Sequence, residues 1–143
     1  ISEPKDLDGD GILEFTVGRW PKLDGCHPCW KDRQAIIGLR DGEFVPVCKA
    51  FPNFFHANIK WNKMFYDGQS NRENLLEVIA ELALSHAQIG ENGWAEKYAR
   101  EYVAILGVST HPLLDTVLRA KALAHLQCPV EAILNDDPHW RRQ

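Results

Sequence analysis

The sequence predicts an α+β fold, in which a small N-terminal antiparallel β unit is followed by a C-terminal bundle of three to four helices. Two observations predict it. Residues 1–50 alternate short runs of β-forming residues with turn-forming Asp and Gly. From residue 70 onward, apolar residues recur every three to four positions, which is the helical period. We therefore divide the 143-residue chain into a β unit at 1–68 and a helical region at 69–143, packed together as one compact domain.

Three strands are expected in the N-terminal part of the chain, at 13–19, 35–39 and 43–47. The last two are joined by Asp41-Gly42, and an Asp-Gly pair between two apolar runs is a strong hairpin signal.

The aromatic stretch 51–66 is harder to assign. Ala57, Ile59 and Trp61 alternate with polar residues, which favours a strand at 56–61, although Trp61 and Phe65 also lie at a helical spacing. We expect these aromatic residues to form core where the sheet meets the helices, and a ligand groove is the alternative.

Three helices and a short last turn are expected at 70–89, at 94–106, from 112 and from 129. A capping box opens the first, a glycine ends the second, and a proline lies in the first turn of each of the others. These boundary residues are Ser70 and Glu73, Gly107, Pro112 and Pro129, with Thr110 or His111 as the cap of the third helix.

The stretch 6–14 carries the strongest chemical signal, because four carboxylates and two glycines lie within nine residues. Such a density of negative charge is costly unless a cation lies inside it, and Ca²⁺ prefers six to eight oxygen ligands. The expected ligands are Asp6, Asp8, Asp10, the carbonyl of Ile12 and Glu14. An ordinary Asp-Gly turn without metal is the alternative.

The motif departs from an EF-hand, because its twelfth position is Val17 and only five residues precede Asp6. Asp-x-Asp-Gly-Asp-Gly-x-x-Glu followed by an apolar strand and Gly18 resembles the calcium loop of FG-GAP (VCBS-type) repeats. That resemblance covers 6–18, implies the same five ligands and implies an extracellular or periplasmic protein. It implies the loop and not the propeller of that family, because this chain has one copy and a propeller needs about four to eight blades.

The first two predicted helices resemble a tetratricopeptide hairpin through the small residues Ala83, Ala95 and Ala99. Any antiparallel helix pair gives this pattern, and one pair is fewer than the three repeats that such arrays need. We therefore interpret the pair as generic helix packing.

The Cys26-His27-Pro28-Cys29 motif allows three interpretations. A disulfide ranks first, because the calcium loop suggests export. A zinc site with Cys26, Cys29 and further ligands from His27 and Cys48 ranks second. A thioredoxin-like redox pair ranks third, because a hairpin follows the motif rather than a helix. Cys48 and Cys128 could pair or remain buried thiols, and spacing does not decide between these.

The remaining histidines are scattered without ligand spacing, and no catalytic set is expected among them. His86 and His125 lie on predicted helices, and we expect them to be packed or hydrogen-bonded.

Composition excludes some classes of partner. The net charge is −4, from 16 basic and 20 acidic residues, and four of the acids belong to the loop. The rest of the chain is balanced, which argues against nucleic acid. No apolar run approaches the roughly 20 residues of a membrane span. The chain begins without Met, so we expect a processed or truncated N-terminus from which a signal peptide would have been lost.

The sequence thus predicts a non-catalytic, calcium-binding, extracytoplasmic domain, whether secreted, periplasmic or at the cell surface. Its role would be structural, or it would bind a protein or a saccharide. The alternative is a thiol-disulfide redox or zinc-binding protein that uses Cys26 and Cys29.

Overall fold

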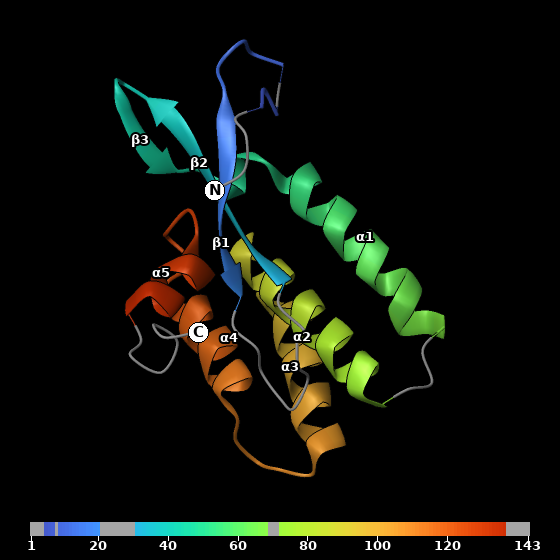
Figure 1. The fold of residues 1–143 in the computed structure, drawn as a ribbon. Coiled ribbons are helices and arrows are strands. Elements are labelled where there is room, and N and C mark those ends of the chain that lie inside the picture. Colours follow the sequence, from blue (N-terminus) through green and yellow to red (C-terminus); the bar gives the residue numbers. More distant parts are fainter. Residues whose placement is uncertain (1–4, 8, 21–30, 69–71, 137–143) are drawn as a thin grey trace.

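The structure is a computed structural model, and it describes residues 5–7, 9–20, 31–68 and 72–136. A small antiparallel sheet lies at one end of a layer of helices, so the predicted α+β fold is confirmed (Figure 1). The strands are β1 (Glu14–Trp20), β2 (Lys31–Arg40) and β3 (Glu43–Pro46). A short 3-10 turn, η1 (Cys48–Ala50), precedes the helices α1 (Pro52–Gly68), α2 (Arg72–Gln88), α3 (Asn92–Leu106), α4 (Pro112–Ala122) and α5 (Pro129–Asp136).

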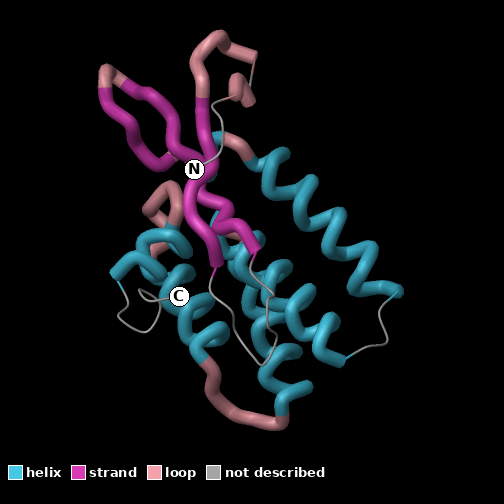
Figure 2. The backbone as a smooth tube through the Cα atoms, viewed as in Figure 1, coloured by secondary structure: helices cyan, strands magenta, loops and turns pink. Residues whose placement is uncertain are grey.

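The sheet has the strand order β1-β2-β3, and both pairs are antiparallel. Asp41 and Gly42 have φ values of 51° and 81°. Positive φ at both central residues is typical of the two-residue turns that match the twist of a hairpin. The predicted hairpin is therefore confirmed, and it projects beyond the helices together with the N-terminal loop (Figure 2).

The predicted strand at 56–61 is wrong, because this stretch lies inside α1. The residues that α1 turns inward are Phe55, Ile59, Asn62 and Tyr66, which recur at helical spacing along one face. Phe55 has no exposed surface and Asn62 is 6% exposed. A helix lets these four residues pack on one side of the segment, and this packing matters more than the short alternation of apolar and polar residues that favoured a strand.

Helix α2 is central, since it contacts α1, α3, α4 and α5. Its last three turns are buried on every side, which agrees with a sequence that is apolar around much of its circumference. The other predicted helices are also confirmed, and His111 caps α4 by accepting a hydrogen bond from Leu113 N at 3.0 Å. The predicted capping box begins at Ser70, which lies outside the described residues.

Two hydrophobic clusters fill the interior. The larger joins α2, α3, α4 and α5, and the smaller lies between the sheet and the start of α1. A disulfide between Cys48 and Cys128 lies within the smaller cluster, with 5.3 Å between the Cα atoms. The sequence did not decide whether these two cysteines pair, and the structure shows that they form a disulfide. The buried members of the smaller cluster are Ala35, Ile36, Val47, Cys48, Phe51, Phe55 and Cys128.

The start of α5 depends on a buried side chain from α2. Gln88 has no exposed surface, and its Oε1 accepts hydrogen bonds from Val130 N at 2.9 Å and Glu131 N at 3.4 Å. The first backbone N–H groups of a helix have no partner within that helix. Gln88 therefore supplies the acceptor that lets α5 begin inside the protein.

We expect Gln88→Met to lower the free energy of unfolding by about 1–3 kcal/mol, because it leaves buried N–H groups without their acceptor. Urea denaturation measures the loss. The matched control is Gln127→Met, because Gln127 also accepts from a backbone N–H, that of Lys49 at 3.1 Å, but does so at an exposed position. Equal losses in the two variants would contradict this role for Gln88.

Candidate metal centre

The N-terminal loop is closed at its base by backbone hydrogen bonds. Lys5 N donates to Glu14 O and Glu14 N donates to Lys5 O, each at 2.7 Å. This bridge fixes the two ends of the loop side by side. The side chains that precede β1 are thereby brought close to Glu14, the first residue of that strand.

Asp6 organises the interior of the loop. Its Oδ1 accepts a hydrogen bond from Gly9 N at 2.8 Å and its Oδ2 accepts one from Gly11 N at 2.9 Å. Gly9 and Gly11 have φ values of 76° and 83°, which glycine adopts without the steric penalty of a side chain. The two glycines of the motif thus let the chain fold back around the Asp6 carboxylate.

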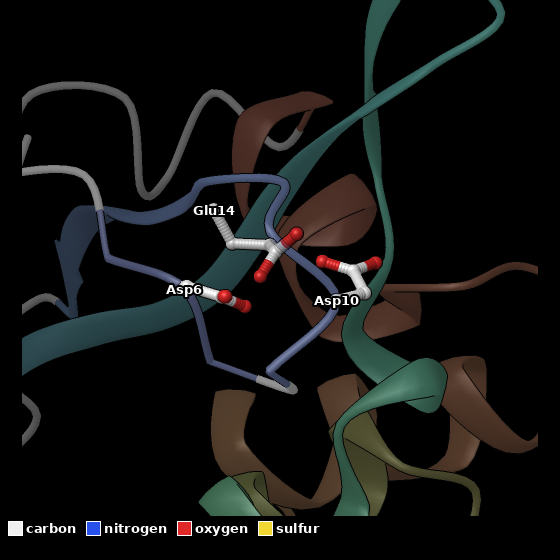
Figure 3. A group of neighbouring side chains, drawn as sticks. All are labelled: Asp6, Asp10 and Glu14. Carbon is white, nitrogen blue, oxygen red and sulfur yellow. The ribbon is translucent and has the colours of Figure 1, made fainter.

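Three of the predicted ligands converge. Asp6, Asp10 and Glu14 each place a carboxylate oxygen within 4.8 Å of the others, and the side chains point toward one another (Figure 3). Asp6 and Asp10 are exposed, whereas Glu14 has no exposed surface. Like charges at this separation repel, and the repulsion grows as water is excluded. A positive charge near Glu14 offsets this repulsion.

One positive charge comes from β2. Arg40 Nη1 lies 4.0 Å from Glu14 Oε2. Glu14 pairs with Gly38 across the sheet, and Arg40 lies two residues further along the same face of β2. A Cβ atom at Gly38 would lie 2.9 Å from Arg40 Nη1, so the glycine leaves room for this side chain. Sequence analysis missed Arg40, because its approach to Glu14 depends on the pairing of β1 with β2, which the sequence did not predict.

The carboxylates keep the capacity to bind a cation. Glu14 Oε1 accepts a hydrogen bond from Leu7 N at 3.1 Å, and Asp10 Oδ1 accepts one from Ile12 N at 2.8 Å. A carboxylate offers about four acceptor positions, so these bonds are compatible with simultaneous coordination. The donor set is entirely oxygen, which suits a hard divalent cation. Asp8 lies outside the described residues, and the Ile12 carbonyl as a ligand stays a prediction.

The motif at Cys26 and Cys29 lies outside the described residues. Its disulfide, zinc and redox interpretations therefore stay predictions from the sequence. A thiol titration of the native protein distinguishes them, because a low-pKa reactive thiol indicates redox chemistry and an inert disulfide does not.

A second polar cluster joins three helices. Glu91 accepts from His86 Nδ1 at 2.8 Å and from His56 Nε2 at 2.9 Å, one bond on each carboxylate oxygen. The ring of His86 stacks on Trp94 and Tyr98, with centroid distances of 5.9 and 5.8 Å. The prediction that His86 is packed or hydrogen-bonded is confirmed, whereas the prediction for His125 is wrong in its location, because α4 ends at Ala122 and His125 lies exposed in the turn that follows. Glu91 precedes α3 as its N-cap, yet its carboxylate bridges the histidines and makes no capping bond.

Burial and hydrogen bonding shift the pKa values of His86 and Glu91. Burial lowers the pKa of His86, and its hydrogen bond to Glu91 offsets that only in part. Burial also disfavours ionised Glu91, but hydrogen bonds from His56 and His86 outweigh it and lower the Glu91 pKa. A lowered pKa in the folded state means that the unfolded chain binds the proton more readily. Both groups therefore make folding less favourable as the pH falls.

We expect the free energy of unfolding to decrease as the pH falls from 7 through the ordinary histidine value of 6.5 and below. The contribution of Glu91 is lost below its ordinary value of 4.5. His86→Gln keeps a donor for Glu91 but does not titrate, so it should flatten the upper part of this profile. Urea melts at pH 5–8 measure the effect, with His125→Gln at an exposed position as the control. A profile unchanged by His86→Gln would contradict the assignment.

Comparison of the chain with models of known families, with curated proteins and with solved structures gave no significant match. The resemblances to FG-GAP loops and to tetratricopeptide hairpins therefore stay predictions. Within the described part of the chain, no helix combines the length and apolar character needed to cross a membrane.

Proposed function

We propose that this chain is a non-catalytic, extracytoplasmic domain in which Ca²⁺ binds the N-terminal loop and stabilises it. In this role the domain is structural or binds another molecule. The observation that carries the proposal is the convergence of Asp6, Asp10 and Glu14 within 4.8 Å, with Glu14 fully buried. Arg40 offsets one of these charges at 4.0 Å, and a divalent cation offsets the remainder.

Calcium is favoured over magnesium by the form of the loop. Ca²⁺ accepts six to eight oxygens in a flexible arrangement, whereas Mg²⁺ demands near-octahedral geometry and keeps several waters. A loop with several carboxylates close together supplies many protein oxygens to one centre. The Cys48–Cys128 disulfide supports the extracytoplasmic part of the proposal, because disulfides persist in oxidising compartments.

Titration of the metal-free protein with CaCl₂ tests the proposal directly. At a calcium concentration of 100 times Kd, binding to the folded state should add about 2.7 kcal/mol to the free energy of unfolding. For a chain of this size, that corresponds to a rise in Tm of roughly 10 °C. Isothermal titration calorimetry gives Kd and stoichiometry, and thermal melts in calcium and in chelator give the shift.

Variants that remove one charge locate the ion. Glu14→Gln should weaken calcium binding at least about tenfold, because affinity follows the number of charged ligands. The matched control is Asp41→Asn, which removes one exposed negative charge from the hairpin turn, where Asn also tolerates the positive φ. A midpoint that stays the same in millimolar calcium and in chelator would discard the calcium role.

A further inference from the structure

Helix α1 is held to the rest of the protein through one face. Phe55 and Asn62 are buried on this face, and Tyr66 Oη donates to the carboxylate of Glu101 on α3 at 2.8 and 3.0 Å. Asn58 adds hydrogen bonds to α2. Figure 1 shows α1 at the edge of the molecule, with α2 alongside it on the inner side. The outer face of α1 is therefore available for contact.

That outer face carries large apolar side chains. Trp61, Met64 and Phe65 are 59%, 63% and 45% exposed, and the rings of Trp61 and Phe65 lie 5.2 Å apart. Residues three, four and seven positions apart are neighbours on one face of a helix, so Phe54 extends the same row toward the start of α1. We call Phe54, Trp61, Met64 and Phe65 the aromatic row.

A pocket of about 500 Å³ lies at the N-terminal end of the aromatic row. Phe54 belongs to both, so the pocket adjoins the row. Leu7 contributes a wall from the acidic loop, and its N–H is held by Glu14 Oε1. The loop that would bind calcium thus also shapes the pocket. The lining residues are Leu7, Ala50, Phe51, Pro52, Asn53 and Phe54.

We propose that the aromatic row and its pocket bind a short segment of another protein, which places one large apolar side chain in the pocket, lays further apolar side chains along Trp61 and Phe65, and carries an acidic residue opposite Lys60. This inference names the partner for the interaction role in the proposed function and rests on that role.

The size of the surface favours a short segment over a second copy of this chain. With about 200 Å² for each fully exposed side chain of this size, Trp61, Met64 and Phe65 together present roughly 330 Å². A stable dimer buries about 800 Å² per partner. Apolar patches of about 300–600 Å² are often functional on monomeric proteins.

The side chains that line the pocket favour a peptide over a saccharide. A sugar has hydroxyl groups all round its ring, and each one taken out of water needs a hydrogen-bonding partner. Asn53 is the one polar side chain among the pocket's lining residues, whereas Leu7, Pro52 and Phe54 are apolar. A volume near 500 Å³ is sufficient for the side chain of a Trp, Phe or Leu.

Charge at the edge of the row specifies the partner further. Lys60 is exposed and lies one helical turn before Met64, whereas Lys63 is engaged by Asp67 at 2.7 Å and by the ring of Tyr66. An acidic side chain that flanks the apolar residues of the partner would meet Lys60 and improve selectivity and association rate.

Selection of random 12-residue peptides displayed on phage, with the whole 143-residue protein immobilised in calcium, tests the proposal. The expected consensus combines aromatic or aliphatic residues with Asp or Glu. Fluorescence anisotropy with the synthetic consensus peptide should show at least tenfold weaker binding to Trp61→Gln/Phe65→Gln. The control Leu118→Gln, which changes an exposed apolar residue on α4, should bind like wild type. Lys60→Glu should weaken binding several-fold.

The proposal would be overturned by no enriched consensus, by a consensus bound equally by the double variant, or by self-association in sedimentation that Trp61→Gln/Phe65→Gln abolishes. Saccharide binding on a glycan array that requires Trp61 would also overturn it. Calorimetry with CaCl₂ separates this inference from the calcium role. Peptide binding without calcium binding supports the surface alone, whereas calcium binding without any selected peptide removes the surface and leaves the metal site.

Discussion

Replacing Cys48 and Cys128 together by alanine is expected to lower the free energy of unfolding by about 4 kcal/mol. The disulfide joins residues 80 positions apart, and the restriction that it places on the unfolded chain grows with the length of the closed loop. Both sulfurs lie in the cluster between the sheet and α1, so their packing is lost as well. The free energy of unfolding of a typical domain is about 5–15 kcal/mol, so this loss is a large fraction of the total stability.

Thermal and urea denaturation measure this loss, and the decrease in Tm should be roughly 15 °C. The variants Cys48→Ala and Cys128→Ala provide the control, because each alone removes the same bridge. Their losses should each approach that of the double variant rather than add up to it. Reduction of the wild type is a poorer test, since it would also break the bridge predicted between Cys26 and Cys29. Single losses below about 1 kcal/mol that sum to the double loss would show that no bridge forms in solution.

Phe55→Ala is expected to cost about 3–5 kcal/mol, which is typical for truncation of a fully buried aromatic residue. Phe55 has no exposed surface and packs beside the disulfide, where it anchors the first turns of α1. The matched control is Trp61→Ala on the same helix. Trp61 is 59% exposed, so this truncation should cost less than about 1 kcal/mol.

Urea denaturation of the two variants gives the loss in free energy of unfolding for each, and hydrogen exchange along α1 shows which residues of the helix lose protection. Protection should fall throughout α1 in Phe55→Ala and stay near wild type in Trp61→Ala. Similar losses for the two would mean that α1 docks through its outer face. That result would exclude the aromatic row as a free binding surface.

The sequence predicted those elements whose ends carry local signals. Asp41-Gly42 located the hairpin, Gly107 ended α3, and Pro112 and Pro129 began α4 and α5. In each case, the geometry of a turn or a helix end demands a particular residue type. These parts need little information from the rest of the chain.

The parts that depend on distant residues were not predictable in the same way. The stretch 56–61 satisfied a strand pattern as well as a helix pattern. Packing decides between them, since Phe55 packs in the cluster beside the sheet and Tyr66 packs against the other helices. The pairing of Cys48 with Cys128 depends on α5 reaching the end of the sheet, which no spacing encodes. For the candidate metal centre, the spacing in the sequence predicted that Asp6, Asp10 and Glu14 converge, and their carboxylates lie close together in the structure.

The disulfide turns residues 48–128 into a covalent ring. The connection between α3 and α4 is exposed from Gly107 to Thr110, as suits attack by a protease. A single cut there leaves two fragments that migrate as one species on a gel until a reductant is added. The protein would therefore survive a nick as one molecule, with the aromatic row and the acidic loop both on the amino-terminal fragment.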